Sequence, residues 1–112
     1  MVITIYNYDT PILKIRSDGI KAQAQWIGPK HIKIPRYIYP ENITPQGISR
    51  FCETRQPPRT RFDIDRILKA YGLREYLPIQ MCRISHGVTH TDHLWMLFDG
   101  QEKPRYADIT VR

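Results

Sequence analysis

Hydrophobic and polar residues alternate in three short runs at the N-terminal end of the chain. Residues 2–7 are β-branched and aromatic, residues 11–17 alternate Ile and Leu with Lys and Arg, and residues 20–28 place small and aromatic side chains on one face. Residues 8–10 and 17–19 supply the polar and glycine residues that favour tight turns between strands. The pattern predicts an antiparallel meander of three strands.

The middle of the chain has the apolar spacing of helices. Thr44 provides an N-cap for a helix over residues 45–54, which has proline at its first position. Residues 63–71 carry apolar side chains at the i, i+3, i+4 and i+7 spacing. Residues 78–85 also begin at a proline and are followed by Gly87, which indicates the end of a third helix. The expected apolar face of that helix consists of Leu77, Met81 and Ile84.

Residues 93–98 are apolar at almost every position, so both faces of this strand are expected to be covered. This pattern predicts a strand at the centre of the sheet. Residues 30–45 contain three prolines, which predicts an extended segment that wraps the surface. The tail, residues 105–112, is expected to add a short helix or an edge strand. The sequence therefore predicts one α+β domain over residues 1–112, with a small antiparallel sheet packed against two or three short helices.

The composition is that of a globular protein with excess positive charge. Hydrophobic residues make up 41% of the chain, charged residues 25%, and the net charge is +6. This charge favours an acidic partner, such as nucleic acid, an anionic protein groove or a phosphate-bearing ligand. No apolar run approaches the ~20 residues of a membrane helix, and the N-terminus lacks the features of a signal peptide. We therefore expect no membrane partner and a bacterial or host-cell cytoplasmic location, where Cys52 and Cys82 stay reduced.

Positive charge is concentrated in residues 49–66, where five arginines surround a pair of prolines. Guanidinium groups on an exposed loop bind phosphates and carboxylates bidentately. The alternative is a solvated face whose arginines pair with Glu53, Asp63 and Asp65. The predicted basic binding surface consists of Arg50, Arg55, Arg59, Arg61, Arg66, Lys30, Lys33, Arg36, Tyr37 and Tyr39.

Histidines cluster directly before the apolar strand and raise the question of a metal site. Structural zinc usually joins distant segments, whereas these residues all lie in one short stretch, so we predict no metal and no cofactor. The favoured interpretation is that the histidines cap a helix and line a turn, with Asp92 bonding backbone N–H groups. The weaker candidates for metal ligands are Cys82, His86, His90 and His93.

A nucleophilic pair of Cys82 and His86 would need an exposed thiol of low pKa. Apolar neighbours on the predicted helix favour a buried, inert cysteine instead. No other catalytic motif is present in the sequence, so we predict no enzymatic activity.

A series of motif residues follows one order within residues 45–109: Arg55, Pro58, Arg61, Gly87, Thr91, Asp92, Leu94, Trp95, Tyr106, Ala107, Asp108 and Ile109. This order resembles the N-terminal region of HipA-like kinases, which are related to toxin–antitoxin systems, and short stand-alone proteins of mobile elements. In that region a loop with spaced arginines and a proline precedes a helix, and a glycine, a Thr-Asp pair and a Trp-containing strand follow. The resemblance implies that Trp95 is a core or interface anchor and that the histidine-rich turn is a structural joint. Kinase activity is not implied, because the catalytic domain of such kinases would follow residue 112.

The resemblance and the charge together lead to three expectations about function. The first is a non-enzymatic protein-binding module, an accessory or antitoxin-type protein of a bacterial or phage mobile element, with a kinase-like toxin as its partner. The second is a phage-encoded inhibitor of host defence, of the anti-CRISPR type, that binds a nucleoprotein complex. The third is a direct nucleic-acid binder that uses the arginine-rich loop.

Overall fold

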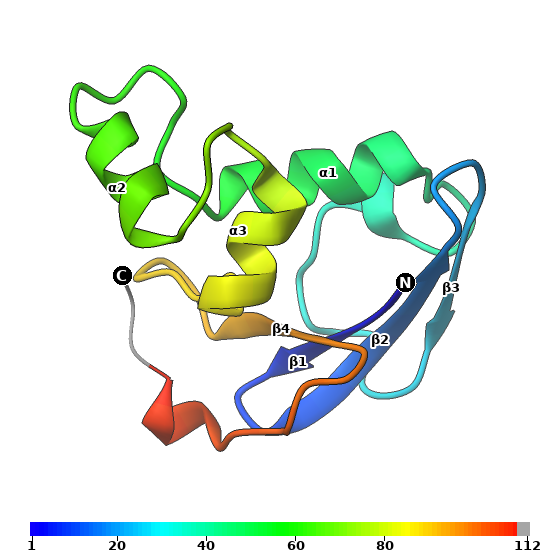
Figure 1. The fold of residues 1–112 in the computed structure, drawn as a ribbon. Coiled ribbons are helices and arrows are strands. Elements are labelled where there is room, and N and C mark those ends of the chain that lie inside the picture. Colours follow the sequence, from blue (N-terminus) through cyan, green and yellow to red (C-terminus); the bar gives the residue numbers. More distant parts are fainter. Residues whose placement is uncertain (110–112) are drawn as a thin grey trace.

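Within residues 1–109, four antiparallel strands and three α-helices, with two short 3-10 helices, form the α+β fold that the sequence predicts (Figure 1). The computed structural model describes residues 1–109. The sheet has the order β3-β2-β1-β4, and the helices lie together on one side of it. The elements are β1 (Val2–Asn7), β2 (Thr10–Ser17), β3 (Ala22–Trp26), η1 (Arg36–Ile38), α1 (Pro45–Thr54), α2 (Ile64–Ala70), α3 (Pro78–Ser85), β4 (Leu94–Phe98) and η2 (Tyr106–Asp108).

The predicted N-terminal meander is confirmed, with one correction to its third strand. β1 pairs with β2 and β2 with β3, both antiparallel. The strand expected from residue 20 begins at Ala22, because the Asp18 carboxylate accepts the backbone N–H groups of Ile20 and Lys21 and holds both residues in the turn. Ile20 is therefore 83% exposed.

The strand expected at the centre of the sheet, residues 93–98, is instead the edge strand β4. It is buried on both faces because Met96 points into the core under the helices and Trp95 into a second cluster on the other face. Its outer edge is partly paired by the turn after α3, where the Met96 N–H donates to the His86 carbonyl at 2.7 Å. Apolar residues on both faces therefore do not require a neighbouring strand on each side.

α1 has the bounds that the sequence predicts, and its N-cap is confirmed. The Thr44 hydroxyl accepts the Gly47 N–H at 2.9 Å. α3 also has its predicted bounds, but the predicted apolar face is partly wrong: Leu77 and Ile84 are exposed. The helix turns Cys82 toward α1 instead, where the thiol donates to the Cys52 carbonyl at 3.4 Å.

α2 lies away from the sheet, at the far end of the helical layer (Figure 1). Leu68 is its one buried residue. For the tail expected at residues 105–112, the structure shows the short 3-10 helix η2, and residues 110–112 lie outside the described part. None of the helices in residues 1–109 is long and apolar enough to cross a membrane.

Gly28, directly after β3, lies close to the backbone of β2, and a substitution at this position tests that contact. A Cβ at this position would collide with the carbonyl oxygen of Pro11, which is backbone and moves only with β2. We expect Gly28→Ala to lower the free energy of unfolding by about 3 kcal/mol in urea titration. The control Gly19→Ala meets open space at a positive φ of 88° and should lose about 1 kcal/mol. Equal losses for the two variants would contradict the close contact.

Candidate functional site

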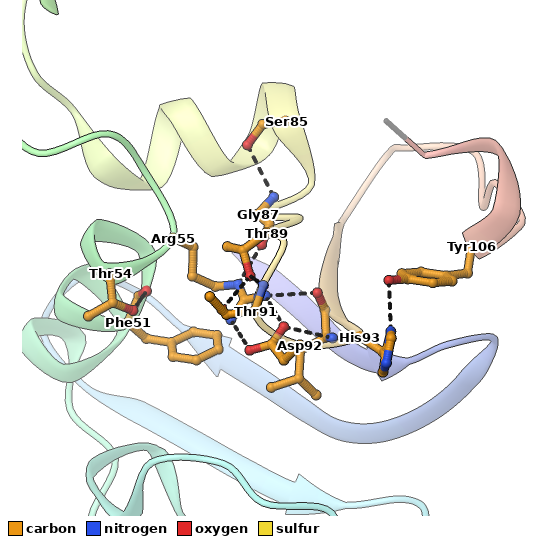
Figure 2. Close-up of polar contacts among 11 residues, drawn as sticks. Phe51, Thr54, Arg55, Ser85, Gly87, Thr89, Thr91, Asp92, His93 and Tyr106 are labelled. Carbon is orange, nitrogen blue, oxygen red and sulfur yellow. Dashed lines mark hydrogen bonds and ion pairs between the residues drawn. The ribbon is translucent and has the colours of Figure 1, made fainter. Parts of the chain in front are cut away.

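Arg55 is buried, which corrects its predicted place on the exposed basic surface. Its side chain is 5% exposed and reaches from the end of α1 into the turn before β4 (Figure 2). The two terminal nitrogens donate to the Asp92 carboxylate at 2.6 and 3.0 Å, which is a bidentate ion pair. Two further N–H groups donate to the carbonyls of Gly87 and Leu94. Arg55 thus connects three segments of the chain and is not available to a partner.

Asp92 has the backbone-bonding role that the sequence predicts, and in addition it pairs with Arg55. Its Oδ1 accepts the Leu94 N–H at 3.0 Å, which is the predicted Asx-type turn. Burial of the Asp92 carboxyl opposes its ionisation, but the hydrogen bonds and charge of Arg55 outweigh this and hold the pKa of Asp92 below its usual value. The pair is therefore ionised at neutral pH.

Gly87 ends α3 as predicted, and it also leaves room for the arginine. Its φ is +63°, and it follows His86, which is also left-handed. A Cβ on Gly87 would meet the side chains of Met96, Cys82 and Arg55. The helix end and the ion pair therefore depend on the same glycine.

The segment between α1 and α2, residues 55–63, is called the arginine loop below. Asp63 at its end pairs with Arg61 at 2.6 Å and with Arg66 at 2.9 Å. The Arg61 N–H also donates to the Pro58 carbonyl. These contacts order the tip of the loop, and they confirm the intramolecular pairing with Asp63 that the sequence left as an alternative.

Phe62 at the tip of the arginine loop is 96% exposed, and the sequence analysis did not single it out. Two features of the sequence predict its exposure: Phe62 lies outside the helical spacing that begins at residue 64, and both of its neighbours in the chain are charged. An aromatic side chain held in solvent on an ordered loop is a candidate anchor for a partner.

Two hollows adjoin along α1 and meet at Thr54. One, of about 590 Å³, is lined by Arg50 and Arg59 and leads toward the arginine loop. The other, of about 390 Å³, is lined by Lys33 and Tyr37 and has the Arg55–Asp92 pair in its wall. The structure thus brings part of the predicted basic surface together.

Stacking contacts hold some of these cations and tyrosines. Arg50 lies over the Tyr37 ring at 4.4 Å, and Arg59 lies over the Tyr76 ring at 4.8 Å. Tyr39 does not join the surface, because its ring packs edge-on against Trp26 at 5.3 Å. Lys30 and Arg36 are exposed on the segment that follows β3.

The four weaker candidates for metal ligands are held by separate contacts. Cys82 is buried against α1, and His86 Nδ1 lies 2.9 Å from the Met96 carbonyl oxygen. His93 stacks on Tyr8, whereas His90 is exposed. Among residues 1–109, no group of three or more His, Cys, Asp or Glu side chains is placed to hold a metal ion.

Cys82 and His86 do not face one another as a nucleophile and its base, because each is occupied by the contact just described. The neighbouring Cys52 thiol is also buried. Its hydrogen bond with Cys82 and its burial raise the pKa of Cys52. Cys52 therefore stays a protonated thiol at neutral pH.

Comparisons with family models, with curated proteins and with solved structures find no match to this chain. The resemblance to HipA-like N-terminal regions therefore stays a prediction. The structure does give two of the residues on which it was based a joint role, since Arg55 and Asp92 form the buried pair.

The burial of Arg55, whose partner Asp92 is half-buried, predicts a large difference between two Arg→Lys substitutions. Arg55→Lys keeps the charge but cannot make the bidentate contact and both carbonyl bonds, so we expect the free energy of unfolding to fall by about 2–3 kcal/mol. Arg61→Lys, in a half-exposed pair, should change it by less than about 0.5 kcal/mol. Urea unfolding followed by circular dichroism measures both. Similar small losses would show that the Arg55 network is not needed for stability.

The lowered pKa of Asp92 predicts a specific pH dependence. Its contribution to stability is complete above the unfolded-state value of about 3.9 and is lost as the pH falls through the lower folded-state value. The difference in unfolding free energy between the wild type and Asp92→Asn should therefore be constant near pH 6 and shrink below about pH 4. Other carboxyl groups are common to both proteins and cancel in the difference. A difference that grows on acidification would contradict the assignment.

Proposed function

We propose that this chain is a non-enzymatic protein-binding module whose contact surface is the arginine loop. The observation that carries the proposal is Phe62, fully exposed on a loop that ion pairs hold in place. The partner would offer an apolar pocket for the Phe62 ring, with acidic groups around it for Arg59 and Arg61.

Burial of the Phe62 ring on binding and the ion pairs within the arginine loop both favour this loop as an anchor. Burying a phenylalanine side chain contributes about 1.5–3 kcal/mol. Asp63 pairs with Arg61 and Arg66 on either side of Phe62, and these pairs reduce the conformational entropy that the loop loses on binding. The adjoining hollow at Arg50 and Thr54 gives a partner room to extend its contact along α1.

Protein is favoured over nucleic acid at this loop because much of its charge is already neutralised. Arg55 is paired with Asp92, and Arg61 and Arg66 share Asp63. Fewer free cations are left for phosphates than the sequence alone suggested. The net charge of +6 still steers an acidic partner toward the molecule.

The resemblance to HipA-like N-terminal regions supports a kinase-like toxin as the partner, in the cytoplasm of a bacterium. The alternative partner is a nucleoprotein complex of host defence, which a phage-encoded inhibitor would bind. Both partners are reached by the same loop in this proposal. Two free, buried cysteines suit a reducing compartment.

Site-specific photo-crosslinking tests the proposed surface. A photoreactive phenylalanine analogue at position 62 should capture a partner protein in native cell extract, and mass spectrometry then identifies it. The same analogue at Ile20, which is 83% exposed and far from the loop in sequence, is the matched control and should capture none. Nuclease treatment of the extract should leave the capture unchanged.

With the captured protein purified, Phe62→Ala should weaken binding about thirtyfold, as expected for an aromatic anchor worth about 2 kcal/mol. Ile20→Ala should bind as the wild type does. Isothermal titration calorimetry measures both affinities. Equal capture at positions 62 and 20, or capture that nuclease abolishes, would reject the arginine loop as a protein-binding surface.

A further inference from the structure

The face of the sheet opposite the helices has a covered aromatic half and an open polar half. On the covered half, Tyr6 stacks on Trp95 with ring centroids 4.4 Å apart, and Tyr106 and Ile109 pack against them. Lys103 lies over the Tyr6 ring at 5.4 Å. The open half is formed by β2 and β3, where no segment of this kind covers the described strands.

Strand register places four long polar side chains side by side on the open half. Lys14 lies opposite Gln25, and Arg16 lies opposite Gln23. Directly opposed residues of antiparallel strands point to the same face, so the four form a two-by-two array. A hollow of about 300 Å³ lies among them. Thr4, opposite Lys14 on β1, continues the row.

The array carries positive charge that the described residues leave uncompensated. Within residues 1–109, neither Lys14 nor Arg16 has a carboxylate within ion-pair distance. Asp18 lines the adjoining hollow next to Arg16, but its carboxylate already accepts two backbone N–H groups of its own turn. Lys21 adds a further cation to that hollow. The face thus attracts anions.

We infer that this face of β2 and β3 binds duplex DNA, with the edge strand β3 and its neighbour β2 facing the major groove. β3 is the edge strand and β2 lies about 4.8 Å behind it, so this edge of the sheet can approach a groove about 12 Å wide. Lys14 and Arg16 supply contacts to phosphates or guanine edges. Gln23 and Gln25 supply the paired donor and acceptor that read adenine.

The chemistry of the face separates duplex DNA from other partners. Single-stranded nucleic acid is bound through exposed aromatic rings, whereas the rings on this sheet face, Tyr6 and Trp95, are buried. The major groove of duplex RNA is too narrow and deep for side chains to read. A protein partner would need an apolar centre, and the open half consists of cations and amides.

The site is independent of the arginine loop and goes beyond the proposed protein-binding function. In Figure 1, the loop between α1 and α2 and the β2–β3 hairpin lie at opposite ends of the molecule. One chain can therefore hold DNA on the sheet and a protein on the loop at the same time.

Fluorescence anisotropy with a labelled duplex of about 20 base pairs, roughly two helical turns, tests the inference. We expect the wild type to bind with an affinity that falls steeply between about 50 mM and about 200 mM salt. The double variant Lys14→Gln with Arg16→Gln should bind about tenfold more weakly at the lower salt and show a shallower salt dependence. Lys69→Gln with Arg74→Gln removes the same charge from the helical side and should keep wild-type binding.

A second variant separates base reading from charge. Gln23→Ala with Gln25→Ala should keep the salt dependence but lose any preference that the wild type shows in selection from a randomised duplex pool. Thermal unfolding checks that each variant is folded. The single variants Lys14→Gln and Arg16→Gln should each lose less affinity for the duplex than the double variant does.

Three results would overturn the inference: no duplex binding by the wild type at the lower salt, equal losses for the sheet variant and the helical control, or equally tight binding of single-stranded DNA. Weaker binding of the captured partner by Phe62→Ala in calorimetry, with duplex binding intact, would show that the two surfaces act separately.

Discussion

The bidentate pair between Arg55 and Asp92 is the contact on which the rest of the structure depends. It joins the end of α1, the turn after α3 and the start of β4, and the same guanidinium also binds the carbonyls of Gly87 and Leu94. Removing an arginine from water is costly, and here four hydrogen bonds compensate for it. A neutral residue of similar size would fill the space, but it would remove the arginine donors of the Gly87 and Leu94 carbonyls and leave the Asp92 carboxylate with the Leu94 N–H alone. The pair therefore specifies how the helical layer sits on the edge of the sheet.

Much of the fold follows from local signals in the sequence. Turn residues at 8–10 and 17–19 define the meander, and Thr44 with its following proline sets the start of α1. The position of β4 at the edge, the burial of Arg55 and the exposure of Phe62 are different, because each depends on contacts between segments far apart in the chain. Arg55 and Asp92 are 37 positions apart, and no local pattern distinguishes Arg55 from the other arginines of its loop. The resemblance to HipA-like N-terminal regions included Arg55 and Asp92 among its matching residues, but it did not predict that they form an ion pair.

Composition does not predict which cations of this protein are free to bind a partner, and the pairing of strands in the sheet explains why. The arginine-rich stretch has five arginines clustered within residues 49–66, yet three of them have carboxylate partners. Lys14 and Arg16 looked unremarkable as the polar positions of an amphipathic strand, but pairing with β3 sets them beside two glutamines. Strand register brings together cations that lie on the same face of the sheet, whereas folding compensates part of the charge that is clustered in the sequence.

The ion pairs of the arginines and the alignment of the polar side chains on β2 and β3 give the two sides of the molecule different surface chemistry. On the helical side, three of the five arginines are held in ion pairs and an aromatic ring is exposed, which suits a desolvated protein contact. On the sheet side, the aromatic rings are covered by the segment after β4 and the cations stay free, which suits a hydrated, salt-sensitive contact with phosphates. Because Trp95 lies on β4 and Arg55 binds the carbonyl of Leu94 beside it, the Arg55–Asp92 pair supports both faces. A weakened pair should therefore disturb both contacts together, whereas a change at Phe62 or at Lys14 should disturb only one.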